Sequence, residues 1–117
     1  MSQTIVKPDA QKTLRNVPFE KGFHFMTKKG EYTGLTASSL AEFAAKLETA
    51  DVNSVLFHYP RGDFQNWITD TLEDEELANR MCMVPPDLSG EKLRKQLADI
   101  VQKRISELQK ILENIQR

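Results

Sequence analysis

The chain has 117 residues, of which 39% are hydrophobic and 28% charged, with a net charge of −1. This length allows one domain with a single core, and the composition excludes wholly disordered and fibrous classes. No apolar run approaches the ~18 residues that cross a bilayer, and the N-terminus lacks an apolar secretory segment. Because the single Cys82 excludes an internal disulfide, we expect a cytoplasmic protein with no membrane partner.

Like charges are segregated along the chain. Residues 1–30 carry a net +4, residues 31–89 a net −8 and residues 90–117 a net +3. Basic ends suggest nucleic-acid contact, but neither end interleaves aromatic residues with Lys and Arg. Weak nucleic-acid binding is therefore an unfavoured alternative, which would use the basic side chains Lys92, Arg94, Lys95, Lys103 and Arg104.

The N-terminal part of the chain predicts an arm followed by a β-hairpin. Residues 1–18 are polar, contain two prolines and show neither helical nor alternating spacing, which predicts a flexible or loosely docked arm. Residues 19–117 then form the single domain. Apolar side chains alternate from Phe23 to Thr27, and a turn at Lys28 to Gly30 follows, so we expect a short hairpin. Its phenylalanines should rest on helices, because an isolated hairpin is marginally stable.

Four amphipathic stretches between the hairpin and the C-terminal segment predict helices. Ser39 begins a capping box with a helix to about Thr49, and Asp51 caps a second helix that Pro60 is expected to end. Asp63 and Asp74 are expected to cap two more helices. The inward residues share the three- and four-residue spacing of one helix face. They are Leu40, Phe43, Ala44, Leu47, Val52, Val55, Leu56, Tyr59, Phe64, Trp67, Ile68, Leu72, Leu77, Ala78 and Met81.

The longest predicted helix covers residues 90–116. A helix of this length measures about 40 Å at ~1.5 Å per residue, whereas a body of about 90 residues is only about 30 Å across. Part of its apolar stripe would then overhang and could pair with a second copy or a partner helix. This C-terminal seam consists of Val101, Ile105, Leu108, Leu112 and Ile115. The alternative is that the helix folds back on its own domain.

The candidate site residues in the middle of the chain have both a functional and a structural interpretation. His58, Asp63 and Trp67 are the candidates for a ligand cleft. The structural alternative is that the ring of His58 is hydrogen-bonded and that Trp67 lies in the core. No catalytic, cofactor-binding or metal-ligating motif is recognisable, because the spacings of His24, His58 and Cys82 match no ligand pattern. Cys82 is expected to be a buried hydrophobic residue.

Short aromatic motifs recur in a characteristic order. They are Phe23-His24-Phe25, Thr33-Gly34, Ala37 to Phe43, Leu56-Phe57-His58, Gly62-Asp63-Phe64 with Trp67-Ile68, and Leu77-Ala78. This order resembles a prokaryotic family known only as a domain of unknown function, over roughly residues 19–85. The resemblance carries over no catalytic residues. Larger relatives that lie near carbohydrate-metabolic proteins imply an alternative function, as an enzyme or accessory subunit of carbohydrate metabolism.

The sequence as a whole predicts a mainly α fold of about five helices, with a long C-terminal helix and a small N-terminal hairpin. The favoured hypothesis is a cytoplasmic, non-enzymatic interaction module without a cofactor. It would self-associate, as a dimer or a larger homo-oligomer, through the C-terminal helix. The competing hypothesis is an enzyme with its ligand cleft at His58, Asp63 and Trp67.

Overall fold

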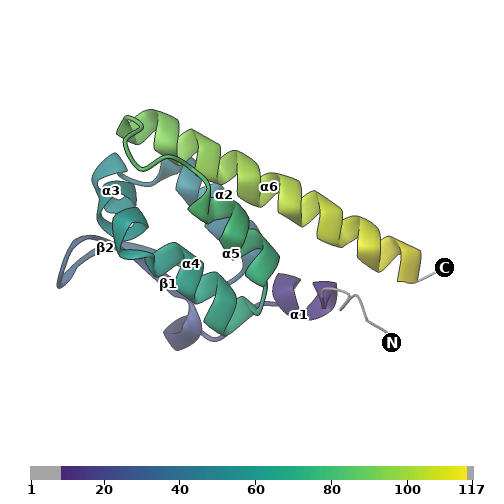
Figure 1. The fold of residues 1–117 in the computed structure, drawn as a ribbon. Coiled ribbons are helices and arrows are strands. Elements are labelled where there is room, and N and C mark those ends of the chain that lie inside the picture. The colour runs from purple at the N-terminus through teal and green to yellow at the C-terminus, as the bar shows by residue number, and fades with distance from the viewer. Residues whose placement is uncertain (1–8, 116–117) are drawn as a thin grey trace.

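The computed structural model describes residues 9–115, and within them it contains six α-helices and one antiparallel two-stranded sheet (Figure 1). The elements are α1 (Ala10–Leu14), η1 (Phe19–Lys21, a 3₁₀ turn), β1 (Phe23–Lys28), β2 (Glu31–Ala37), α2 (Leu40–Thr49), α3 (Val52–Arg61), α4 (Asp63–Trp67), η2 (Ile68–Leu72, a π-helical segment), α5 (Glu75–Cys82) and α6 (Gly90–Ile115). The mainly α class, the hairpin and the long last helix are confirmed.

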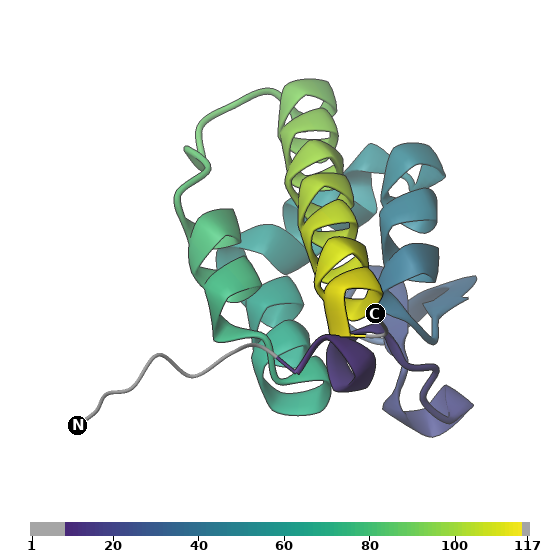
Figure 2. The same cartoon turned by 90° about the vertical axis from the view of Figure 1, so that its right-hand side faces the viewer.

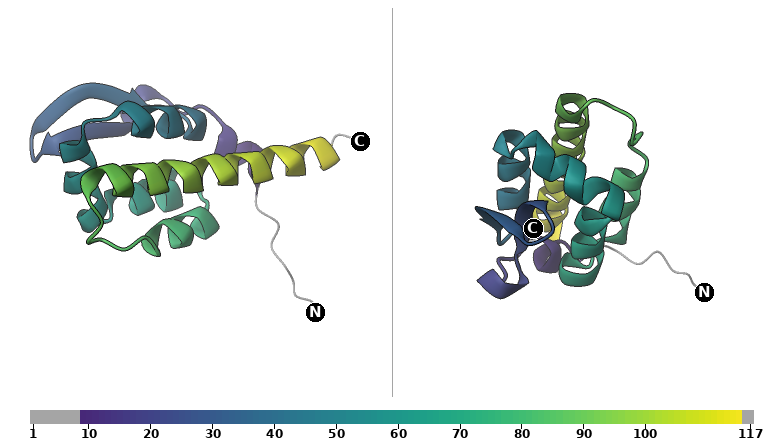
Figure 3. Two further views of the ribbon diagram at one scale, coloured as in Figure 1. Left: turned by 90° about the horizontal axis from the view of Figure 1, so that it is seen from above. Right: turned by 90° about the vertical axis from the view of Figure 1, so that its left-hand side faces the viewer.

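Helix α6 is the axis on which the other elements pack. It contacts α1, α2, α3 and α5, and the hairpin and α5 lie on opposite sides of it (Figures 2 and 3). Leu93, Leu97, Val101 and Leu108 of α6 are buried. The long helix therefore folds back on its own domain, which is the alternative that the sequence left open.

The hairpin closes an aromatic core, as expected. Phe23 and Phe25 are buried, and their ring centroids lie 5.7 and 5.8 Å from that of Phe43 on α2. Phe64 on α4 joins the cluster, with its centroid 5.0 Å from that of Phe23. Aromatic pairs at these separations add to the free energy gained from burial. The two strands are thus stabilised by the helices beneath them.

Residues 9–18 differ from the expected N-terminal arm. Asp9 caps α1 by accepting a hydrogen bond from the backbone N–H of Lys12 at 3.0 Å. The hydroxyl of Thr13 donates to the carbonyl of Leu72 at 3.1 Å, and Val17 is buried. Five helical residues are too few for a periodic pattern, so sequence reasoning missed α1. The rest of the expected arm, residues 1–8, lies outside the described residues.

The junction between α3 and α4 differs from two predictions, namely that Pro60 ends the first of these helices and that Asp63 caps the second. Pro60 lies inside α3, which continues to Arg61 because Gly62 ends it in a left-handed conformation with φ of 76°. The N–H of Gly62 bonds to the carbonyls of His58 and Tyr59. A glycine adopts positive φ without the steric cost of a side chain. Gly62 is also the N-cap of α4, so Asp63 is not a cap and its carboxylate bonds elsewhere.

One predicted core residue and Cys82 point outward. Leu56 is 41% exposed, whereas Ser54 and His58 are buried in its place. Cys82 is exposed and was wrongly expected to be buried. In α5 the predicted inward residues Leu77, Ala78 and Met81 are buried, so Cys82 lies outside the face that packs on the core.

Candidate functional site

Helices α5 and α6 are joined by a network of ion pairs that crosses between them. Arg104 of α6 is 6% exposed and donates two hydrogen bonds, at 2.8 and 3.0 Å, to the carboxylate of Asp74, which is 4% exposed. Asp74 also caps α5 by accepting from the N–H of Leu77 at 3.3 Å. Two parallel bonds between a guanidinium and a carboxylate fix direction as well as distance. The buried pair therefore sets the position of α6 against the start of α5.

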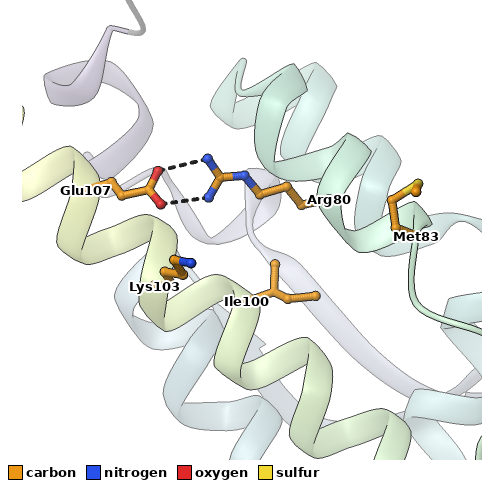
Figure 4. A pocket seen from close by; sticks show the side chains of 5 residues that line it. All are labelled: Arg80, Met83, Ile100, Lys103 and Glu107. Carbon is orange, nitrogen blue, oxygen red and sulfur yellow. Dashed lines mark hydrogen bonds and ion pairs between the residues drawn. The ribbon is translucent and has the colours of Figure 1, made fainter.

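A second, more exposed pair continues this network one helical turn further on. Arg80 of α5 donates two hydrogen bonds to Glu107 of α6, both at 2.9 Å, and a third to Glu76 at 2.8 Å (Figure 4). Arg104 adds a bond to Glu107 at 3.1 Å. The hydrogen bonds from Arg80, which outweigh the opposing effect of burial, hold the pKa of Glu107 below its ordinary value. Glu107 is thus ionised at neutral pH and accepts three hydrogen bonds from two arginines.

Beyond these ion pairs the two helices leave an open hollow of about 360 Å³, which we call the α5–α6 groove. It is lined by Arg80, Met83, Ile100, Lys103 and Glu107 (Figure 4). Met83 and Ile100 supply apolar surface, and the Arg80–Glu107 pair closes one end. The groove therefore combines an apolar interior with a charged rim, which is the arrangement of residues found at protein interfaces.

Met83 is held outside the core by its neighbours. It is 82% exposed, the highest value among the exposed large hydrophobic residues of the described chain, whereas Met81 and Val84 on either side are buried. The buried hydroxyl of Tyr59 lies 2.7 Å from the carbonyl oxygen of Met81 and 2.6 Å from that of Val84. Because both anchors are fixed, the backbone between them cannot turn Met83 inward without breaking these contacts.

The residues of the C-terminal seam do not form an exposed stripe. Val101, Ile105 and Leu108 are at most 7% exposed, and Leu112 is partly buried against the same core. Their cover includes α1, which lies beside the C-terminal half of α6 (Figure 1). The side chain of Ile115 lies outside the described residues. In this conformation the described part of the seam packs within its own domain.

His58 and Asp63 of the expected ligand cleft are brought together, but in a structural arrangement. The Nε2 atom of His58 accepts the backbone N–H of Met26 at 2.8 Å, so the ring proton is on Nδ1 and is donated to Asp63 at 2.9 Å. Burial lowers the pKa of His58 and outweighs the hydrogen bond to Asp63. Although burial raises the pKa of Asp63, the hydrogen bonds from His58 and Arg61 hold it below its ordinary value. Both ring nitrogens are occupied, which leaves no lone pair for a substrate proton.

Trp67 is a core residue. Its side chain is 8% exposed, and its ring lies 5.4 Å from Phe43 and 5.8 Å from Phe23 between centroids. The indole N–H donates to the carbonyl of Lys21 at 2.8 Å, which satisfies its only polar group. Trp67 therefore links η1 to α4. Its ring is packed in the core and does not line an open cleft beside His58.

A second exposed surface lies on the outer side of the hairpin. Phe19 is 62% and Tyr32 46% exposed, and the ring of His24 lies between them, with centroids 4.9 and 5.9 Å away. The hydroxyl of Thr36 lies 2.8 Å from Nδ1 of His24 and 2.6 Å from the hydroxyl of Tyr32. The contact between His24 and Thr36 joins the two strands, whereas Tyr32 and Thr36 both lie in β2.

The basic residues of α6 are divided between internal and exposed positions. Arg104 is buried, and Arg94 donates to the carbonyl of Ala50 at 2.7 Å and to Glu91 at 2.6 Å. Lys95 lies 3.7 Å from Asp99. A second hollow of about 450 Å³ between α2 and α6 is lined by both signs of charge, Glu48, Glu91, Lys92, Arg94, Lys95, Ala98 and Asp99. Such mixed charge does not form the continuous basic surface that a phosphate backbone requires.

Comparison with known proteins identifies the family but no activity. A family model described as a family of unknown function, DUF5752, matches residues 59–117. The chain belongs to the DUF5752 family. The resemblance to a domain of unknown function is thereby confirmed, although the matched DUF5752 region starts at Tyr59 and extends through α6 rather than ending near residue 85. Neither the curated proteins nor the solved structures contain a match.

The DUF5752 region includes every residue that lines the α5–α6 groove. Sequence reasoning missed this groove because Met83 follows the apolar stripe of α5 and was read only as a neighbour of Cys82. The signal was its phase: residues 77, 78 and 81 share one face of a helix, and residue 83 falls outside it. Within the described residues no helix is long and apolar enough to cross a membrane. The same residues contain no group of three side chains suited to a metal ion.

Proposed function

We propose that this protein is a cytoplasmic, non-enzymatic interaction module whose docking surface is the α5–α6 groove. The observation that carries the proposal is the 82% exposure of Met83 on a backbone fixed by Tyr59. Methionine is enriched at protein interfaces, because its flexible thioether adapts to the partner surface. A fixed backbone lowers the entropy lost on binding.

The rim of the groove supports a protein partner rather than a small substrate. The carboxylate of Glu107 already accepts hydrogen bonds from two arginines. It therefore contributes to the shape of the groove and does not act as a reactive group. Lys103 is exposed, and within residues 9–115 it makes no ion pair. A partner that packs an apolar side chain against Met83 and Ile100 and offers a carboxylate to Lys103 would complement this surface.

Site-specific photo-crosslinking tests this proposal. A benzophenone amino acid in place of Met83 should yield a discrete crosslinked species in cells of the native host. The same amino acid in place of Phe19 is the matched control, because Phe19 is also exposed but packs against His24 of the hairpin and does not line the groove. Identical crosslinking from both positions, or none from position 83, would contradict the assignment.

A substitution separates docking from folding. Met83→Glu should abolish the crosslinks formed from a probe in place of Ile100, while the thermal unfolding temperature changes little, since exposed positions usually contribute within about ±0.5 kcal/mol. Retained crosslinking in the folded variant would show that Met83 is not part of the contact.

A further inference from the structure

We propose that the occupant of the α5–α6 groove is the same groove of a second copy of this chain. This inference rests on the proposed docking surface and names its partner. It does not use the C-terminal seam, which is covered within the domain. The pairing is instead formed by the outer surface of the end of α5, the segment that follows it, and the middle of α6.

An exposed apolar side chain, Met83, lies beside the α5–α6 groove. Met83 projects from the end of α5, and the groove beside it has Ile100 at its base (Figure 4). A two-fold rotation axis exchanges the two copies, so each surface must be complementary to itself. A patch with one projecting apolar side chain next to one apolar hollow meets this condition, because each Met83 can fill the partner's groove.

The same surface of the molecule also carries exposed side chains of opposite charge, Lys103 and Asp87. Lys103 lines the groove. Asp87 lies four residues after Met83, in the exposed segment before α6. In the described part of the chain neither side chain has an ion-pair partner. In the proposed pairing Met83 lies over the partner's Ile100, and Asp87 pairs with the partner's Lys103. Each dimer would thus gain this pair twice.

The segment after α5, which would form part of the contact, is already ordered in the monomer. Val84 is buried and tied to Tyr59, and Pro85 and Pro86 restrict the backbone φ angles of the exposed segment. At the end of the groove, Arg80 of α5 and Glu107 of α6 hold each other in place. Little conformational freedom remains to be lost when two copies meet.

A charge-swap series tests the second copy as partner. Wild-type protein should show a concentration-dependent mass that approaches twice the chain mass in sedimentation equilibrium between about 1 µM and 1 mM. Lys103→Glu and Asp87→Lys should each raise the dissociation constant by roughly tenfold or more, because like charges then face each other. The double variant should recover wild-type affinity, since the swapped charges pair again across the two-fold axis.

Two controls separate this pairing from general effects. Lys110→Glu changes the net charge as Lys103→Glu does, but it lies about two helical turns from Lys103 and does not line the groove, so it should leave the dissociation constant unchanged. Met83→Glu should give a monomer at every concentration with unchanged circular dichroism.

The outcomes distinguish this inference from the proposed function. A wild-type monomer at 1 mM concentration, or a double variant that does not recover association, overturns the pairing of two copies. If the protein is monomeric while a probe in place of Met83 crosslinks a different protein, the inference is wrong and the docking surface stands. If the probe captures nothing and no dimer forms, both are wrong.

Discussion

At the scale of single residues, His58 shows how a candidate catalytic group becomes a structural one. Its two ring nitrogens bond to Met26 of β1 and Asp63 of α4, so one side chain joins the hairpin to the helices. Sequence analysis included this hydrogen-bonded role among its alternatives, because a buried histidine must satisfy both nitrogens. It could not identify the partners, which lie 32 and 5 residues away and meet only in the folded chain.

The pKa of His58 gives a pH dependence with a definite sign. Burial lowers the pKa in the folded protein below the value of about 6.5 in the unfolded chain. The unfolded state therefore binds more protons between these two pKa values, and the free energy of unfolding rises with pH across this interval. The stabilisation is complete above about pH 7 and is lost as the pH falls through the folded pKa.

Histidine ring resonances measured by NMR between about pH 4 and 8 check this prediction. We expect His58 to titrate below 6.5 and to carry its proton on Nδ1 in the neutral form. The charged groups that face the ring are Asp63 and Arg61, and the other neighbours in contact are aromatic. Asp63 titrates in a separate, more acidic window because its own pKa is lowered. A folded-state pKa of His58 above 6.5 would contradict the predicted effect of burial.

At the scale of the elements, the local capping signals at Ser39 and Asp74 are confirmed, whereas those at Pro60 and Asp63 are not. The capping box at Ser39 forms, since the serine hydroxyl accepts from the N–H of Glu42 at 3.1 Å. The Glu42 carboxylate reaches back to the N–H of Ser38 at 2.8 Å. Asp74 likewise caps α5 as expected, but its second role as the partner of Arg104 was not foreseen. That partner is 30 residues away, and no local spacing reports such a contact.

The Asp74–Arg104 pair predicts unequal effects of two arginine substitutions. Arg104→Met leaves the carboxylate of Asp74 buried without its counterion, which should lower the free energy of unfolding by about 3–5 kcal/mol. Arg80→Met removes a pair at the edge of the groove and should cost only about 1 kcal/mol, because its partners are more exposed. Urea denaturation of both variants measures the difference. Equal losses would indicate that the buried pair has no special role in joining α5 to α6.

At the scale of the whole molecule, the two main differences from the sequence predictions have one cause. Because the first 18 residues were expected to form an arm, no helix was expected among them to cover α6. Its stripe then exceeded the available cover and was assigned to a partner. The structure places α1 against α6, with Ala10 and Thr13 buried, and Ile105 and Leu108 of α6 are buried as well. One undetected short helix therefore changed the predicted interface.

Leu108→Glu distinguishes these two views of α6. If the C-terminal seam were an intermolecular contact, this variant would be a folded monomer. Leu108 is fully buried in its own domain, so an unpaired carboxylate at this position should instead remove several kcal/mol, a large part of the about 5–15 kcal/mol that stabilises a typical domain. We expect loss of cooperative thermal unfolding by circular dichroism, whereas the exposed neighbour variant Lys110→Glu unfolds as wild type does. A folded, monomeric Leu108→Glu protein would show that α6 binds a partner through the seam and not through the groove beside Met83.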